Sequence, residues 1–219
     1  KSINARSMSG RLAFYFDSNT CSGCKTCQVA CKDKNDLPMG VLWRRVYELE
    51  GGDWKKEGET WIPEVFSYHL SMACNHCEDP VCLRACPTGA ITKNERGIVS
   101  IDPGTCMGCH YCEWVCPYGA PQFNEETGRM TKCDFCADYL EEGKDPACVA
   151  ACPMRALDFG EVEELKERHP DHENIMPLPD PEICLPAFVV NPHHDHGKTD
   201  QSRAEVSNWE EVKNTREQP

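Results

Sequence analysis

The stretch CMGCHYCEWVCP, residues 106–117, decides how this chain folds, because it places four cysteines within eleven residues. Its spacing is C-x2-C-x2-C-x3-C-P, and related spacings occur on both sides of it. Sixteen of the seventeen cysteines fall into four groups of four, and Cys184 stands alone. The groups are Cys21, Cys24, Cys27 and Cys31 (group one); Cys74, Cys77, Cys82 and Cys86 (group two); Cys106, Cys109, Cys112 and Cys116 (group three); and Cys133, Cys136, Cys148 and Cys152 (group four).

The spacing of groups one and three is the one with which bacterial ferredoxins hold [4Fe–4S] clusters. A cubane cluster has four iron corners, each of which takes one thiolate, and a loop with a cysteine at every third residue reaches three of them. We expect the fourth cysteine to open a helix and to point towards a second cluster. Pro87, Pro117 and Pro153 follow the fourth cysteine in groups two to four, and proline suits the first position of a helix.

Two other uses of cysteine compete with iron–sulfur clusters. Disulfides need an oxidising compartment, leave one of seventeen thiols unpaired, and give no reason for a repeated spacing. Zinc is bound by pairs of C-x2-C knuckles with longer gaps, which only group four resembles. A zinc-stabilised interaction module without a redox role is therefore the remote alternative, and a colourless protein with stoichiometric zinc would identify it.

The composition supports a metal-bound core. Leucine, isoleucine, valine and phenylalanine make up about 17% of the 219 residues, and the formal net charge is −13. Such a share, below about 20%, normally marks a disordered chain when the net charge is high. We expect iron–thiolate bonds to replace much of the missing apolar core. The excess of 36 acidic over 23 basic residues argues against a nucleic-acid partner, because phosphate backbones need a basic footprint.

The sequence contains no segment that predicts a membrane span or a secretory signal. The longest apolar runs, such as residues 12–16, are far shorter than the ~20 residues that a spanning helix needs. The first residues, KSINARSMSG, lack the apolar stretch of a signal peptide. Met8 is an alternative native start, which would make residues 1–7 an extension.

The groups lie in an internal repeat. Short apolar strands are expected at residues 12–17 and 98–102, each running into a cysteine loop. Groups two and three are contiguous and form one module, so groups one and four pair around it. We therefore expect an α+β fold with little regular secondary structure, built from two interlaced ferredoxin-like modules. Module one is residues 8–37 with 127–160, and module two is the inserted segment 67–126.

Two further segments bind no cluster. Residues 38–66 predict a hairpin-like excursion with a turn at Gly51-Gly52 and cross-strand contacts between Trp43…Tyr47 and Trp54…Trp61. Residues 161–169 have helical composition. The rest of 161–219 is rich in Pro, His, Asn and Asp, which predicts an extended tail that binds a partner.

At this point the motifs resemble a known family: the four-cluster iron–sulfur subunits of membrane-bound molybdopterin oxidoreductases. The likeness is greatest to the iron–sulfur subunit of respiratory dimethyl sulfoxide reductase. It extends from about residue 12 to 190 and is carried by five stretches. These are FDSNTCSGCKTCQVACKDKNDL (16–37), RRVYELEGGDW (44–54), CNHCEDPVCLRACPTGA (74–90), CMGCHYCEWVCPYGAPQFNEETGRMTKCDFC (106–136) and ACPMRALDFG (151–160).

The resemblance implies four [4Fe–4S] clusters and a ligand set for each. In order along the electron path, from the molybdenum end, these sets would be Cys21, Cys24, Cys27 and Cys152 (cluster 1); Cys31, Cys133, Cys136 and Cys148 (cluster 2); Cys74, Cys77, Cys82 and Cys116 (cluster 3); and Cys86, Cys106, Cys109 and Cys112 (cluster 4). Some relatives replace one cysteine of group three and carry a [3Fe–4S] centre, but Cys109 and Cys112 are both present here.

The resemblance also implies the partners. A molybdopterin catalytic subunit would lie at one end and a quinol-oxidising integral-membrane subunit at the other. The complex would be peripheral on the membrane, with the periplasmic face favoured and the cytoplasmic face as the alternative. The same electron path would serve a polysulfide, thiosulfate or tetrathionate reductase, or a molybdenum dehydrogenase. We find no candidate catalytic residues, such as an activated nucleophile or a Gly-rich phosphate loop, so this protein is expected to transfer electrons without being an enzyme.

Several residues outside the sixteen cysteines are secondary candidates. Four basic residues lie in or beside the cysteine loops, where they are either ordinary surface charges or groups that raise cluster potentials: Lys25, Lys32, Lys132 and Arg155. His76 and His110 are expected to donate hydrogen bonds to sulfur. The tract His193, His194 and His196 is expected to be solvated, with a metal site as the alternative. Cys184 is expected to be a small structural residue, and Trp114 to serve packing.

Overall fold

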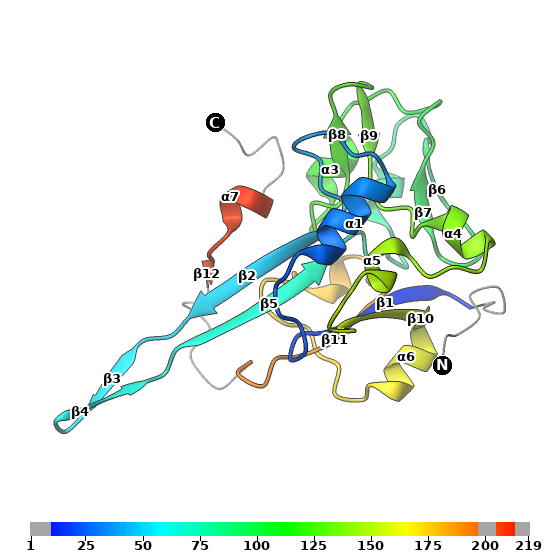
Figure 1. Cartoon of the computed structure of the whole chain (residues 1–219). Helices are drawn as coiled ribbons and strands as arrows, with labels where there is room; N and C mark the ends of the chain where they lie inside the picture. The colour runs from blue at the N-terminus through cyan, green and yellow to red at the C-terminus, as the bar shows by residue number, and fades with distance from the viewer. Residues whose placement is uncertain (1–9, 197–204, 213–219) are drawn as a thin grey trace.

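The computed structural model describes residues 10–196 and 205–212 of the protein. A three-stranded sheet anchors one end of the molecule (Figure 1). Its central strand β1 (Leu12–Asp17) pairs antiparallel with β10 (Leu157–Glu161) and parallel with β11 (Phe188–Asn191). Every second residue of β1 faces helix α6 (Val162–Arg168), and the alternate residues enter the cysteine-containing core. Because both faces are covered, the strand sequence LAFYF is apolar throughout.

The cysteine loops connect short helices and small hairpins. Helix α1 (Thr26–Lys34) packs against α5 (Ala147–Ala150), and α2 (Val81–Arg84) packs against α3 (Tyr111–Val115). The two-stranded pairs are β6 (Ile91–Lys93) with β7 (Val99–Ile101), and β8 (Gln122–Asn124) with β9 (Arg129–Thr131). Helix α4 (Ala137–Glu141) follows group four's first loop.

A long two-stranded arm extends from the body (Figure 1). Strand β2 (Arg45–Gly51) pairs with β5 (Phe66–Met72), and β3 (Trp54–Glu57) continues the arm in pairing with β4 (Thr60–Pro63). Strand β12 (Glu205–Val206) adds to the outer edge of β2, and α7 (Trp209–Val212) follows it.

The predicted turn at Gly51-Gly52 is wrong. The chain reverses at Gly58 and Glu59, so Tyr47 lies opposite Leu70 and Trp61 opposite Lys56. The glycine at position 52 has a different cause: its φ is +89°, and a Cβ there would lie 2.0 Å from the carbonyl oxygen of Glu64. Close approach of the two strands, rather than chain reversal, therefore requires this glycine.

The expectation of an extended tail is also wrong for residues 170–196. This segment contains the short 3-10 helix η2 (Pro181–Ile183) and β11, and it packs on the body rather than away from it. Ile175, Cys184 and Val190 are buried in the main core. These scattered apolar residues have no periodicity, which is why the sequence pattern concealed their burial. Residues 197–204 and 213–219 of the tail, and residues 1–7, lie outside the described residues.

The domain boundaries placed at 66/67 and 126/127 fall within paired structure. The first separates β5 from β2, its partner in the arm, and the second falls in the turn between β8 and β9. Within the described ranges, no helix combines the length and apolar character required to cross a bilayer.

Candidate iron–sulfur site

The first C-x2-C pair of each group has the same backbone conformation. The residue before the second cysteine has a positive φ in each pair: Gly23 at 67°, His76 at 41°, Gly108 at 72° and Phe135 at 63°. A left-handed conformation costs a residue with a side chain about 1–2 kcal/mol. His76 and Phe135 are held in it all the same, so the loop geometry is imposed by what the loop surrounds. This repetition indicates four sites of one kind.

The third cysteine of each group lies at the second residue of a helix. These are Cys27 in α1, Cys82 in α2, Cys112 in α3 and Cys148 in α5. The expectation that the fourth cysteine opens a helix is wrong. In groups two to four it lies at or beyond the helix end, because the proline after it disfavours helical geometry at the preceding residue. Group one has Lys32 in place of proline, and α1 accordingly continues past Cys31 to Lys34.

Two aspartates begin equivalent loops. Asp17 accepts hydrogen bonds from the Asn19 amide, at 3.0 Å, and from the Thr20 hydroxyl, while its carbonyl accepts from the Cys21 amide. Asp102, four residues before Cys106, makes the same contacts, with Gly104 and Thr105 in the places of Asn19 and Thr20. Each carboxylate thereby fixes the turn that delivers the first cysteine of its group.

The thiols gather into four quartets whose members come from different groups. Burial and the charges of neighbouring thiolates raise the pKa of each central thiol, and for Cys77 a hydrogen bond with the Cys184 thiol raises it most. These neighbours are Cys27, Cys152 and Cys24 for Cys21; Cys148 and Cys136 for Cys31, with Cys133 beside all three; Cys74 and Cys116 for both Cys77 and Cys82; and Cys106, Cys109 and Cys86 for Cys112. The four sets that the resemblance implies are thus brought together in space, as the first to fourth quartets.

The quartets also have an order. The charge of Cys148 acts on Cys27, which joins the first quartet to the second. Cys74 acts on Cys133, which joins the second to the third. Cys112 acts on Cys82, which joins the third to the fourth. The quartets therefore form a row, and the third and fourth cysteines of each group belong to adjacent quartets.

The surroundings of the quartets fit a sulfur-rich, negatively charged cofactor. Small cavities lie at the first and third quartets, lined by their cysteines. Buried N–H donors without a hydrogen-bond partner occur on Arg44, Asn75 and His76, which adjoin the quartets. Buried donors are normally satisfied, so acceptors are expected at these places. All seventeen cysteines are free of disulfides.

Comparison with known proteins agrees with this geometry. Two 4Fe-4S dicluster domain families match, one at residues 65–162 and the other at 20–91. The B subunit of anaerobic dimethyl sulfoxide reductase from Escherichia coli is 48% identical over 205 residues, which cover 94% of this sequence and 100% of that protein. The protein belongs to this family of iron–sulfur subunits. It carries four [4Fe–4S] clusters, and its function is electron transfer rather than catalysis.

Relatives in other complexes are also similar to this iron–sulfur subunit. The thiosulfate reductase electron transfer subunit PhsB of Salmonella typhi is 40% identical over 68% of this sequence and 74% of its own length. The iron–sulfur subunit of the nitrate-inducible formate dehydrogenase of Escherichia coli is 37% identical over 74% of this sequence and 58% of its own length. The family therefore spans reductases and a dehydrogenase.

The four basic residues singled out by sequence differ in their surroundings. Lys132 is 4% exposed and donates to the carbonyls of Val99 and Cys133, and its charge lowers the pKa of Cys82 against the larger effect of burial. The other three serve different contacts. Lys25 forms ion pairs with Glu48 and Glu211, Lys32 donates to the carbonyls of Leu37 and Pro38, and Arg155 is exposed.

The histidines of the subunit differ in their contacts. His76 accepts from the Val99 amide at Nδ1, and its Nε2 is one of the unpartnered donors. His110 contacts Glu113 at 2.8 Å, and its ring lies tilted against that of Phe123, with the ring centres 4.4 Å apart. His193 and His194 lie with Asp195 close enough to hold a metal ion, with ring nitrogens 3.6 and 3.5 Å from the Asp195 carboxylate. Trp114 is 58% exposed, which does not fit the expected packing role.

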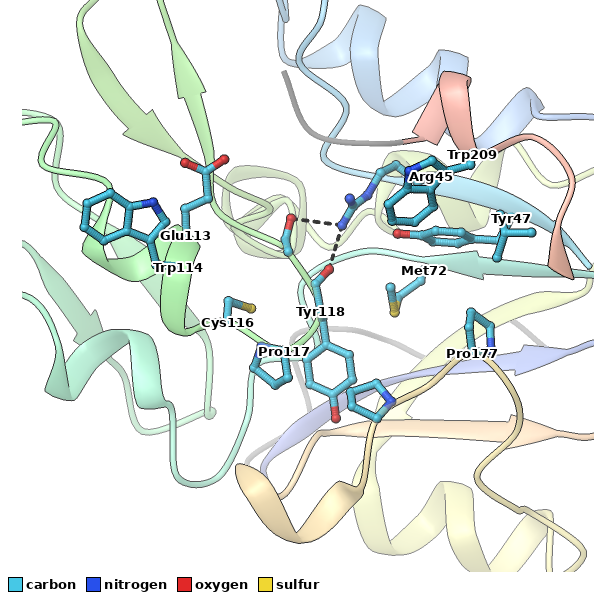
Figure 2. Close-up of a pocket in the computed structure, with 13 residues that line it drawn as sticks. Arg45, Tyr47, Met72, Glu113, Trp114, Cys116, Pro117, Tyr118, Pro177 and Trp209 are labelled. Carbon is cyan, nitrogen blue, oxygen red and sulfur yellow. Dashed lines mark hydrogen bonds between the residues drawn. The ribbon is translucent and has the colours of Figure 1, made fainter. Parts of the chain in front are cut away.

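Arg44, Arg45 and the position of Cys184 are the features that sequence reasoning missed. Arg45 donates to the carbonyls of Tyr118 and Gly119, at 2.8 and 3.0 Å, and so fixes the loop after Cys116 (Figure 2). Cys184 is buried, with its sulfur 3.3 Å from that of Cys77. Arg44, one residue before Arg45, is buried beside the first two quartets. In the sequence, the available signal for these residues was a pair of arginines before an apolar strand, but no cysteine lies near this pair.

Proposed function

We propose that this subunit carries single electrons between a quinol-oxidising membrane subunit and a molybdopterin catalytic subunit that reduces S- or N-oxides. The observation that carries the proposal is the row of four quartets, in which a thiolate of one quartet acts electrostatically on a thiol of its neighbour. The 48% identity to a dimethyl sulfoxide reductase subunit over nearly the whole sequence supports the choice of complex.

The proposed ligands are the sixteen cysteines of the four quartets, in the order first to fourth from the molybdenum end. The clusters, when bound, each accept and release one electron. The protein holds each thiolate by a loop and a helix, and buries most of the thiols away from water. Burial and hydrogen bonds to sulfur are the means by which a protein sets cluster potentials. No residue of this subunit breaks a substrate bond in this scheme.

In this proposal, the choice of membrane face rests on the family resemblance. The complex is peripheral on the membrane, and we favour the periplasmic face. The acidic surface of a subunit with formal charge −13 would meet basic surfaces on its partners.

The second candidate function uses the same row of clusters with other partner subunits. The complex would then be a thiosulfate, polysulfide or tetrathionate reductase, or a dehydrogenase. The likeness to the thiosulfate reductase and formate dehydrogenase subunits supports it.

Isolation of the intact complex from membranes tests the proposed partners. We expect a large subunit containing molybdenum and a membrane subunit to co-purify with this protein. Quinol should then drive reduction of dimethyl sulfoxide or an N-oxide by the complex. Quinol-driven reduction of thiosulfate or tetrathionate alone, or oxidation of formate, would transfer the assignment to the second candidate.

Cysteine replacement tests the interlaced ligand sets. Cys116 lies in group three by sequence but in the third quartet, with Cys74 and Cys77, in space. Cys116→Ser should therefore disturb the same electron paramagnetic resonance (EPR) signal as Cys77→Ser, and a different one from Cys109→Ser. Iron should fall from about sixteen atoms per subunit towards about twelve. Cys184→Ser is the matched control and should keep all the iron. Agreement of Cys116→Ser with Cys109→Ser would contradict the pairing.

A further inference from the structure

Arg44 is the most deeply buried cation in the described part of the protein. Its side chain is 1% exposed. One guanidinium nitrogen, Nη1, donates to the carbonyl and the hydroxyl of Ser71, at 3.3 and 3.2 Å. The guanidinium lies 4.6 Å from the centre of the Phe14 ring. Nε and Nη2 are buried and have no partner. A guanidinium left in this state would be costly, so its position requires a compensating negative group.

The negative groups that face Arg44 are cysteine sulfurs of two quartets. Although burial lowers the pKa of the guanidinium, thiolate charges raise it overall, and Arg44 is permanently charged. The charges belong to Cys27 of the first quartet and to Cys148, Cys133 and Cys31 of the second. The largest charges that act on Arg44 are therefore all thiolates. The Ser71 hydroxyl that accepts from Arg44 is itself 3.3 Å from the sulfur of Cys27.

We propose that Arg44 is a positioning residue that fixes a positive charge between the first and second clusters, and that its two unpartnered N–H groups donate to their sulfur atoms. The inference rests on the ligand sets proposed above. Each [4Fe–4S]²⁺ core with four thiolates carries a charge of about −2, and reduction adds another negative charge. A fixed cation stabilises the reduced form more than the oxidised form. Arg44 therefore raises the midpoint potentials of both clusters and offsets the repulsion between them.

Potentiometric titration of the whole complex, followed by EPR, tests this role. In Arg44→Met two of the four midpoint potentials should fall. The ratio of reduced to oxidised cluster at a fixed potential should drop about tenfold for each, which is about 59 mV for a one-electron couple. Arg44→Lys retains the charge and should recover much of the loss. Lys56→Met removes an exposed lysine of β3 and should shift none, which controls for net charge.

The outcomes separate this role from a structural one. Unchanged potentials in Arg44→Met with full iron would overturn the proposal, as would an equal fall in Arg44→Lys. If Arg44→Met does not load iron, wild-type protein labelled with ¹⁵N in its arginine guanidinium groups gives the answer. A ¹⁵N hyperfine coupling in the signals of two clusters is expected, and its absence overturns the proposal. Failure of the ligand sets themselves would appear independently, in the iron content and spectra of the Cys116→Ser protein.

Discussion

Removal of iron will unfold residues 12–160 of this subunit. Cysteines of the first three quartets belong to the main apolar core, and Cys82, Cys106 and Cys112 belong to the second core. Without iron, the sixteen proposed iron–thiolate bonds are lost and free thiols remain buried in their place. The apolar residues around these thiols are few. Folding free energy in such domains is largely metal-binding free energy. Anaerobic chelation should therefore abolish the cooperative unfolding transition and expose the amides of β1 and β5 to rapid hydrogen exchange.

Reconstitution supplies the control for this experiment. Iron and sulfide added back to reduced protein should restore both the brown chromophore and the slow amide exchange. Zinc added in their place should restore neither, because the family carries iron–sulfur clusters. Native exchange protection in β1 and β5 after complete loss of iron would contradict the expectation and show that the protein core alone is sufficient.

Replacement of Phe135 by alanine should have the largest effect of any substitution outside the cysteines. The side chain is fully buried, stacks on Phe14 at 4.1 Å, and meets the rings of His76 and Phe159 edge-on. It joins β1, β10 and two cysteine loops. The loss should amount to about 3–5 kcal/mol, the usual result of truncating a buried phenylalanine. The measurement is the denaturant concentration at which the cluster absorbance is half lost.

Two matched variants define this prediction. Phe135→Leu keeps most of the volume and should cost less than about 1.5 kcal/mol. Trp61→Ala removes an equally large aromatic ring from the exposed arm, where it is 57% exposed, and should change stability by about 0.5 kcal/mol or less. If the denaturant midpoint of Phe135→Ala is no lower than that of Trp61→Ala, the contacts of the Phe135 ring do not stabilise the fold.

The parts of the site that sequence could predict are those encoded in cysteine spacing. A thiolate needs a cysteine, so the groups are visible directly, and the glycines at positions 23 and 108 mark two of the four left-handed residues. The other two are His76 and Phe135, which gave no such signal. Tertiary packing imposes their conformation, and local preference opposes it.

Features that depend on contacts between distant segments could not be predicted. Arg44 is recognisable as functional only once Cys27 and Cys148 are seen beside it. The position of β11 depends on pairing with β1, which lies at the other end of the sequence. The arm was predicted with the wrong turn because two glycines suit either a turn or a close approach of strands, and the sequence alone does not distinguish these.

The order of strands in the first sheet has a consequence for biosynthesis. β1 leaves the ribosome well before its partners β10 and β11, which begin at residues 157 and 188. At about 5–20 residues per second the nascent strand waits on the order of ten seconds or more with both edges unpaired. The sheet, and the cysteine loop that follows β1, can therefore mature only after β10 and β11 have been synthesised. This subunit should depend on chaperones or on late cluster insertion rather than on folding segment by segment.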